Sequence, residues 1–148
     1  MQLSRFTDYT FRVLFYVASN DDRLTTLAEI AGFYGISMEH LRKVVHALGK
    51  SGYLQTFRGK HGGIRLAKQP AEINIGTVIG ISEGLSPLVD CEAQSCCLTP
   101  VCNLHKILAE AQQSFMQTLR QYSLADVLSQ PGMAETLTVR ILDTSALR

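Results

Sequence analysis

The sequence lacks the features of a membrane-bound or exported protein. No apolar run approaches the roughly 18 residues needed to span a bilayer. Near the N-terminus only residues 13–18 form an uninterrupted apolar stretch, after Asp8 and Arg12. That stretch is shorter than the roughly 7–15 apolar residues of a signal peptide. We therefore expect a cytoplasmic protein with no membrane segment.

Tryptophan, internal repeats and low-complexity segments are also absent. Apolar residues nevertheless make up 46% of the chain and charged residues 18%, a balance typical of ordinary globular proteins. At 148 residues the chain is long enough for one domain with its own hydrophobic core and an accessory element.

Charge is nearly balanced overall but unevenly distributed. The net charge is +1, yet residues 1–68 contain ten Lys or Arg against five Asp or Glu, and residues 69–148 contain four against eight. Within residues 36–68 the basic residues outnumber the acidic ones by seven to one. A solvated surface can give such counts, but the asymmetry favours a basic face that binds a polyanion.

The basic half contains the pattern of a helix-turn-helix. Apolar spacing predicts a first helix over residues 5–19. Thr26 and Glu29 have the spacing of a capping box, which begins a second helix. Gly35 then interrupts the pattern, and Ser37 caps a third helix. The apolar residues spaced to pack the last two helices together are Ile30, Tyr34, Ile36, Leu41 and Val44.

The third helix carries polar and basic residues at its outward positions. Such side chains suit base edges and phosphates. A helix-turn-helix places its second helix in the major groove of DNA, so these positions are candidates for reading sequence. The residues expected to face DNA are Ser37, Glu39, His40, Arg42 and Lys43.

A glycine-tipped hairpin is predicted directly after this helix. In "YLQTFRGKHGGIRLA" two short alternating segments flank a tip with three glycines, which supply the backbone freedom that a tight tip requires. Arg58, Lys60 and His61 in the tip suit contact with phosphates or the minor groove. We therefore expect a mainly α-helical fold with a small β wing, a winged helix-turn-helix.

A long helix is predicted after residue 102, following a short strand or turn and a short helix. Its apolar residues recur every three or four positions and form one stripe. The stripe could cover its own domain, but we favour a dimer seam because helix-turn-helix proteins bind as two-fold pairs on half-sites one turn apart. The stripe consists of Leu104, Ile107, Leu108, Ala111, Phe115, Leu119 and Tyr122.

These elements give an expected domain organisation. A winged helix-turn-helix DNA-binding domain occupies residues 1–70, and a connector with a cysteine-rich loop occupies 71–102. A C-terminal dimerisation helix and a short closing helix follow over 103–130, with a tail over 131–148. The expected partners are a pseudo-palindromic double-stranded DNA operator and a second copy of the chain.

All four cysteines lie within "CEAQSCCLTPVC", residues 91–102. A disulfide framework does not suit a cytosolic DNA-binding protein, which leaves a metal site, an iron–sulfur cluster or a reactive thiol switch. The spacing matches neither the paired cysteines of common zinc folds nor ferredoxin sequences. Its long spacers, flanked by Gly84, Pro87 and Pro100, suit a loop shaped by a ligand larger than one ion. Thiolates are soft ligands that suit iron–sulfur clusters.

Together these motifs resemble the winged-helix repressors that bind iron–sulfur clusters. The resemblance covers nearly the whole chain, from "MQLSRFTDY" through "GISMEHLRKVV", "RGKHGGIRLA" and the cysteine loop to "YSLADVL". "FTDY", "LTPVC" and "SLADV" are most similar to the nitric-oxide-sensitive members. The resemblance implies a repressor whose operator affinity is controlled by a two-iron or four-iron cluster that senses nitric oxide. Other members instead sense iron–sulfur or redox status.

By this resemblance, Cys91, Cys96 and Cys102 are the cluster ligands. The family loop also occurs with five residues between its first two cysteines, a spacing that would select Cys97 in place of Cys96. We favour Cys96, since it leaves five residues before Cys102.

The resemblance offers two residues for a fourth ligand. In nitric-oxide-sensitive members an aspartate of the first helix reaches the cluster of the partner subunit, and Asp8 has that position. In cluster-assembly regulators a histidine three residues after the last cysteine is the ligand, and His105 has that spacing. We rank Asp8 first because the N-terminus is similar to the nitric-oxide-sensitive members. A surface carboxylate and an exposed histidine are the alternative interpretations.

Two other classes of function stay open at this point. One is a DNA-binding sensor whose cysteines bind zinc or oxidise directly. The other is a thiol enzyme that uses Cys102 and His105, but the pair has no orienting third group in the sequence. We therefore expect a regulator and not an enzyme.

Overall fold

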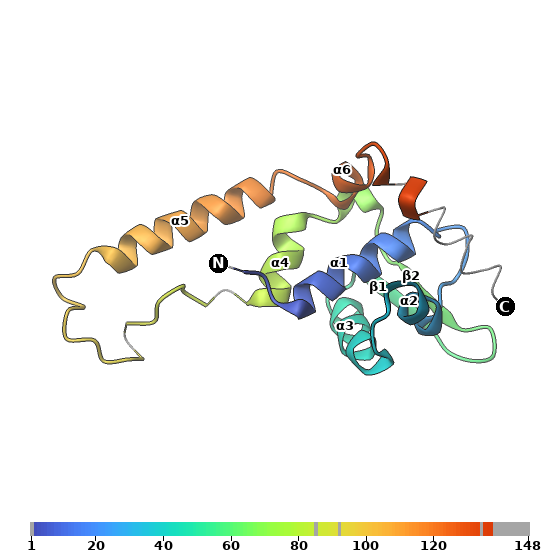
Figure 1. The fold of residues 1–148 in the computed structure, drawn as a ribbon, viewed down its shortest axis with the longest axis horizontal. Coiled ribbons are helices and arrows are strands. Elements are labelled where there is room, and N and C mark those ends of the chain that lie inside the picture. The colour runs from blue at the N-terminus through green and yellow to red at the C-terminus, as the bar shows by residue number, and fades with distance from the viewer. Residues whose placement is uncertain (1, 85, 92, 134, 138–148) are drawn as a thin grey trace.

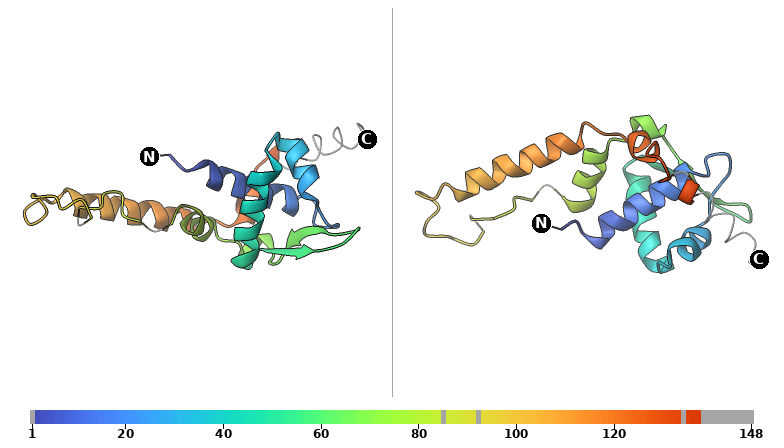
Figure 2. Two further views of the ribbon diagram at one scale, coloured as in Figure 1. Left: turned by 90° about the horizontal axis from the view of Figure 1, so that it is seen from below. Right: turned by 45° about the horizontal axis from the view of Figure 1, so that its top comes forward.

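The computed structural model describes residues 2–84, 86–91, 93–133 and 135–137. Figure 1 shows a head, an arm formed by one long helix, and a loop that runs out beside the arm and turns at its far end. The hairpin projects from the opposite side of the head, as both views of Figure 2 show. Most of the predicted tail, residues 138–148, lies outside the described residues.

The described elements follow the predicted order closely. The head contains the first three helices, the two-stranded hairpin and a short turn of 3-10 helix, followed by the fourth helix. Their bounds are α1 Arg5–Ala18, α2 Leu27–Tyr34, α3 Met38–Lys50, β1 Leu54–Phe57, β2 Gly63–Leu66, η1 Pro70–Glu72, α4 Ile75–Glu83, α5 Leu104–Leu119 and α6 Leu124–Leu128. None of the helices in the described residues is long and apolar enough to cross a membrane.

The predicted caps of the helix-turn-helix are confirmed. Thr26 and Glu29 form a full capping box at the start of α2. Gly35 ends α2 with a φ of 66°, a left-handed conformation that glycine adopts without a steric penalty. The Ser37 side chain accepts a hydrogen bond from the His40 backbone amide and so begins α3. These local signals fix the turn that sets α3 against α2.

The core lies between α1, α3, α4 and the hairpin. Ile30, Ile36, Leu41 and Val44 are buried, as predicted, and Tyr34 is partly buried against them. The most deeply buried apolar side chains of α1 are Val13, Leu14 and Val17. Since burying one such side chain contributes about 1.5–3 kcal/mol, this cluster holds α3 rigidly on α1.

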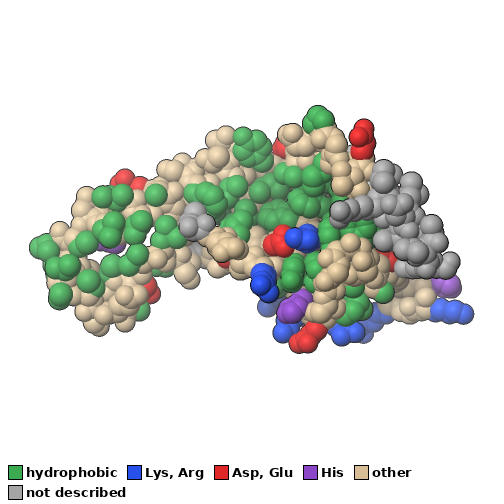
Figure 3. Space-filling model, viewed as in Figure 1, with side chains coloured by type: hydrophobic (Ala, Val, Ile, Leu, Met, Phe, Trp, Pro, Cys, Tyr) green, Lys and Arg blue, Asp and Glu red, His purple; other side chains and the backbone are tan. Residues whose placement is uncertain are grey.

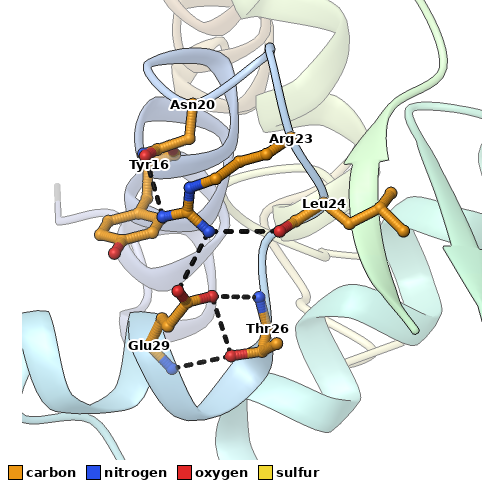
Figure 4. Close-up of polar contacts among 6 residues, drawn as sticks. All are labelled: Tyr16, Asn20, Arg23, Leu24, Thr26 and Glu29. Carbon is orange, nitrogen blue, oxygen red and sulfur yellow. Dashed lines mark hydrogen bonds and ion pairs between the residues drawn. The ribbon is translucent and has the colours of Figure 1, made fainter. Parts of the chain in front are cut away.

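A polar latch closes the turn between α1 and α2 (Figure 4). Arg23 donates to the Glu29 carboxylate at 3.0 Å, to the Leu24 carbonyl at 3.2 Å and to Asn20 at 3.1 Å. Burial acts to raise the pKa of Glu29, but hydrogen bonds from Thr26 and the charge of Arg23 outweigh it and lower that pKa. Glu29 is therefore held as a carboxylate that both caps α2 and fastens the turn.

The hairpin is an antiparallel pair attached to the head. Leu54 pairs with Leu66 and Thr56 with Ile64. Backbone hydrogen bonds of 2.9 and 2.8 Å between Thr25 and Ile64 add a short bridge on the other side of β2. The buried Ile64 side chain anchors β2 in the core.

The long helix ends earlier than the apolar stripe predicted. α5 stops at Leu119, and Tyr122 lies beyond it. The chain leaves the helix there because the Tyr122 carbonyl accepts the Ile75 backbone amide at 3.0 Å. Gly76 permits this close approach, since a Cβ atom on it would lie 2.6 Å from the Arg120 side chain. This hydrogen bond and this close approach hold the residues that follow α5 against the start of α4.

Candidate DNA-binding surface and cysteine loop

Helix α3, the predicted recognition helix (the helix expected to read DNA), is amphipathic, with one face in the core and the other exposed. Leu41, Val44, Val45 and Leu48 are buried. All five residues predicted to face DNA are exposed, namely Ser37, Glu39, His40, Arg42 and Lys43. The structure thus brings these residues together on the outer side of one helix.

Several of these side chains also have local partners. The Ser37 hydroxyl lies 2.7 Å from Nδ1 of His40. The His40 ring contacts Tyr9 of α1, with 5.9 Å between centroids. Lys43 Nζ lies 3.5 Å from the Glu39 carboxylate in a well-exposed ion pair, which contributes little to stability and separates readily when DNA competes. Ser37 is therefore a helix cap as well as a candidate DNA contact.

The tip of the wing, residues 58–62, exposes its basic side chains. Arg58, Lys60 and His61 are all exposed. Gly59 has a φ of 107°, a backbone conformation that residues with a Cβ atom rarely adopt. A Cβ atom on Gly62 would lie 2.3 Å from the Phe57 carbonyl oxygen, so only glycine fits there. The tip conformation that presents the three side chains thus depends on its glycines.

Figure 3 shows how the charges are arranged on one face of the molecule. Basic and histidine side chains gather along the edge formed by α3 and the hairpin, whereas the arm shows mainly apolar and uncharged atoms. Sequence analysis did not single out Arg65, whose guanidinium lies over the Phe57 ring at 5.0 Å on the outer face of the wing. The alternation of β2 could have identified it, because its neighbour Ile64 points into the core.

The cysteine loop is folded by short-range hydrogen bonds. The Cys96 amide donates to the Cys91 carbonyl at 3.2 Å, and the Cys102 amide donates to the Leu98 carbonyl at 2.7 Å. Ser95, with a φ of 49°, turns the chain directly before Cys96. All four cysteines are free thiols. Cys91 and Cys102 are half-buried, and Cys96 and Cys97 are exposed.

The two middle cysteines, Cys96 and Cys97, differ in their effect on the pKa of Cys91. Partial desolvation raises the pKa of the Cys91 thiol, and Cys96, Cys102 and Asp90 raise it further. Cys97 has no such effect on Cys91. Cys96 and Cys102 thus both act on Cys91, although the described residues contain no group of ligands close enough to hold a single metal ion. Three soft thiolate donors at this spacing fit a group larger than one ion.

The two candidates for a fourth ligand lie in different places. Asp8 is on α1 in the head and pairs with Arg12 at 2.9 Å. The cysteine loop lies at the far end of the arm, away from α1 of the same chain (Figure 1). His105 lies in the first turn of α5, and its Nδ1 lies 3.0 Å from the Cys102 carbonyl oxygen. Within one chain only His105 is next to the cysteines.

A contact that sequence analysis missed links α4 to α1. Glu83, the last residue of α4, accepts hydrogen bonds from the Ser4 amide at 2.7 Å, the Ser4 hydroxyl at 2.9 Å and the Thr7 hydroxyl. No local pattern announces this contact, because Glu83 and Ser4 are 79 positions apart. Residues 84–90 connect Glu83 to the cysteine loop, so this contact fastens the end of α4, from which the chain leads to the loop, to the start of α1.

Comparison with known proteins identifies the family. Residues 3–130 match the profile of Rrf2, described as an iron-dependent transcriptional regulator. The chain belongs to the Rrf2 family. Among curated relatives, the HTH-type transcriptional regulator NsrR of Halalkalibacterium halodurans is 43% identical over 141 residues, covering 93% of this chain and 97% of that protein. NsrR of Geobacillus kaustophilus is 45% identical over 141 residues, covering 93% and 96%.

Solved structures of Rrf2-type fold agree with the architecture. T. potens IscR gives a TM-score of 0.69 at 24% identity, covering 90% of each chain. CymR, the global cysteine regulator of B. subtilis, gives 0.66 at 22% identity, covering 87% of this chain and 97% of that one. These likenesses concern the fold alone. The predicted winged helix-turn-helix and the predicted role as an NsrR-type DNA-binding transcriptional regulator are confirmed, and the thiol-enzyme alternative is set aside.

Proposed function

We propose that this Rrf2 protein is a homodimeric repressor whose affinity for a pseudo-palindromic operator is controlled by an iron–sulfur cluster that senses nitric oxide. The observation that carries the proposal is the cysteine loop, in which Cys91 lies within electrostatic reach of Cys96 and Cys102. The loop occurs in a chain that is 43–45% identical to NsrR regulators over 93% of its length.

Three residues of one chain would hold the cluster. Cys91, Cys96 and Cys102 supply soft thiolates, while Cys97 stays outside the ligand set. When bound, the cluster supplies iron with which nitric oxide reacts. Asp8 of the partner subunit is the preferred fourth ligand. To bind the cluster, its carboxylate would have to break its ion pair with Arg12. His105 is the alternative, with Nε2 as its available nitrogen because Nδ1 faces the Cys102 carbonyl.

The DNA-binding domain, residues 1–70, would contact the operator through α3 and the wing. Glu39, His40 and Arg42 would read bases, since they project from the exposed face of a helix that is rigidly held. Lys43 and the three side chains of the wing tip would contact phosphates and the minor groove, and Ser37 would contact the backbone while it caps α3.

Dimerisation would use the exposed stripe of α5. No residue of α5 is buried within the described part of the chain, and Leu104 and Ile107 are 56% and 54% exposed. A second copy packed along residues 103–130 would cover this apolar surface and bring two DNA-binding domains onto one operator. The connector and loop, residues 71–102, would then lie at the edge of the dimer.

A series of contacts within the chain connects the cysteine loop, through α4 and α1, to α3. Glu83, at the end of α4 and eight residues before Cys91, accepts hydrogen bonds from Ser4, which caps α1, and from Thr7 on α1. Tyr9 of α1 contacts His40 of α3, and the two helices share the core. A rearrangement of the loop would therefore move α1 and the helix packed on it. A difference of about 1–3 kcal/mol in DNA affinity between the two loop states is the usual size of such coupling.

The adjacent cysteines provide the sharpest test. We would prepare wild type, Cys96→Ala and Cys97→Ala without oxygen and measure iron, sulfide, the ultraviolet–visible spectrum and DNA binding before and after nitric oxide. Wild type and Cys97→Ala should hold the cluster and release DNA on exposure, whereas Cys96→Ala should hold none. Colourless protein that contains zinc, or DNA binding that nitric oxide leaves unchanged, would overturn the proposal. Loss of the cluster in Cys97→Ala alone would overturn the ligand assignment.

A further inference from the structure

A small cavity of about 110 Å³ lies between the start of α1 and the start of α3. Arg5, Phe6 and Tyr9 line it from α1, and His40 and Lys43 line it from α3. Arg5 and Tyr9 are four residues apart and His40 and Lys43 three apart, so each pair lies on one face of its helix. The cavity therefore opens beside the exposed face of the recognition helix.

The cavity carries positive charge that one exposed acid, Glu39 beside Lys43, only partly offsets. Two of its five lining residues are cations and none is acidic. Arg5 is exposed and has no hydrogen bond or ion pair within the described residues. Two other acids of this part of the head are engaged elsewhere: Asp8 pairs with Arg12 at 2.9 Å, and Glu83 accepts bonds from Ser4 and Thr7.

The side chains that line the cavity would hold an anion in one position. Phe6 and Tyr9 are half-buried, and the contact between the Tyr9 and His40 rings closes one side. Lys43 has a partner, Glu39, but both side chains are at least two-thirds exposed, so the pair gives way at little cost. An anion in the cavity would gain two cationic contacts from side chains that lie on two different helices.

We propose that this cavity binds a phosphodiester group of the DNA backbone, so that α1 is part of the DNA-binding surface. Arg5 and Lys43 supply the charge, and Tyr9, whose ring contacts that of His40, forms part of the wall around the phosphate. A helix in the major groove has a phosphate backbone on each side, and the cavity lies on the α1 side of α3. The inference rests on DNA binding by the helix-turn-helix and is independent of the cysteine loop.

The test measures affinity for a mixed-sequence DNA duplex at several salt concentrations by fluorescence anisotropy. Arg5→Gln should weaken binding, and the slope of log affinity against log salt should become shallower by about one unit, as for one lost phosphate contact. Arg5→Lys should restore most of that slope. Lys106→Gln, which removes an exposed cation from α5, should bind as wild type does. Thermal unfolding of each variant shows whether it is folded.

Three results would overturn the proposal. The first is an unchanged salt slope in folded Arg5→Gln. The second is an equal loss of slope in Lys106→Gln, which would mean that the effect is only one of net charge. The third comes from titrating the DNA-free protein with inorganic phosphate. Binding of free phosphate that Arg5→Gln abolishes, with the DNA slope unchanged, would make this a small-anion site.

Discussion

Replacing Glu83 by glutamine tests how strongly the end of α4 is fastened to the start of α1. Glu83 accepts three hydrogen bonds from Ser4 and Thr7. A hydrogen bond to a charged group contributes roughly 1.5–3 kcal/mol when it is desolvated, but Glu83 is exposed and screening reduces that value. Glutamine also keeps an acceptor oxygen. We therefore expect the free energy of unfolding to fall by about 1 kcal/mol, or the melting temperature by about 2–4 °C.

The pH dependence of this difference identifies the charge as its cause. The hydrogen bond from Thr7, followed by those from Ser4, holds the pKa of Glu83 below its ordinary value of 4.5. Because the pKa is lower in the folded state, the stabilisation is fully present above pH 4.5 and is lost as the pH falls through the folded value. Wild type and Glu83→Gln should therefore differ at neutral pH and converge in acid.

Thermal and urea unfolding followed by circular dichroism at several pH values provides the measurement. Comparing the two proteins at each pH cancels the acid titration of Glu29 and Asp126, whose pKa values are also lowered. Glu110→Gln is a matched control, because Glu110 is exposed on α5 and has no partner within the described residues. Equal stability of wild type and Glu83→Gln at neutral pH, or a difference that stays constant in acid, would refute the reasoning.

Three further predictions concern DNA binding and assembly. Arg58→Ala combined with Lys60→Ala should make the salt slope of DNA binding shallower by about two units, and an unchanged slope would remove the wing from the interface. Gly62→Ala should distort the tip, at a cost of about 1–3 kcal/mol in the free energy of folding, and so weaken DNA binding. Its control is Gly32→Ala, which should bind DNA as wild type does because a Cβ atom at Gly32 meets open space. Ile107→Glu should shift the protein toward monomer in sedimentation velocity, and an intact dimer would exclude the α5 seam.

The sequence by itself determined the local elements of the DNA-binding domain. The capping box of Thr26 and Glu29, the turn at Gly35 and the cap at Ser37 all act within three or four residues, so the printed sequence contains both partners of each contact. The apolar spacing of Leu41 and Val44 likewise indicated which face of α3 is buried. The outward residues of that helix follow as its complement, which is why they could be identified in advance.

Local sequence patterns did not predict the end of α5, and they separate Cys96 from Cys97 by one position only. Periodicity carried the predicted helix to Tyr122, but α5 ends at Leu119 because the following segment pairs with Ile75. Adjacent cysteines have nearly the same spacing to their neighbours. In the folded loop the Cys96 amide donates to the Cys91 carbonyl at 3.2 Å, and the choice of Cys96 as a ligand stays a prediction.

Only the tertiary structure decided the contacts between segments far apart in the chain. Glu83 meets Ser4 across 79 positions, and Arg5 and Lys43 line one cavity from two helices. No local propensity encodes such a meeting, because it depends on how α1 packs against α3 and α4 as rigid bodies. The sequence therefore determined which residues are candidates for binding DNA and metal, and the packing of α1 determined which elements of the fold contact one another.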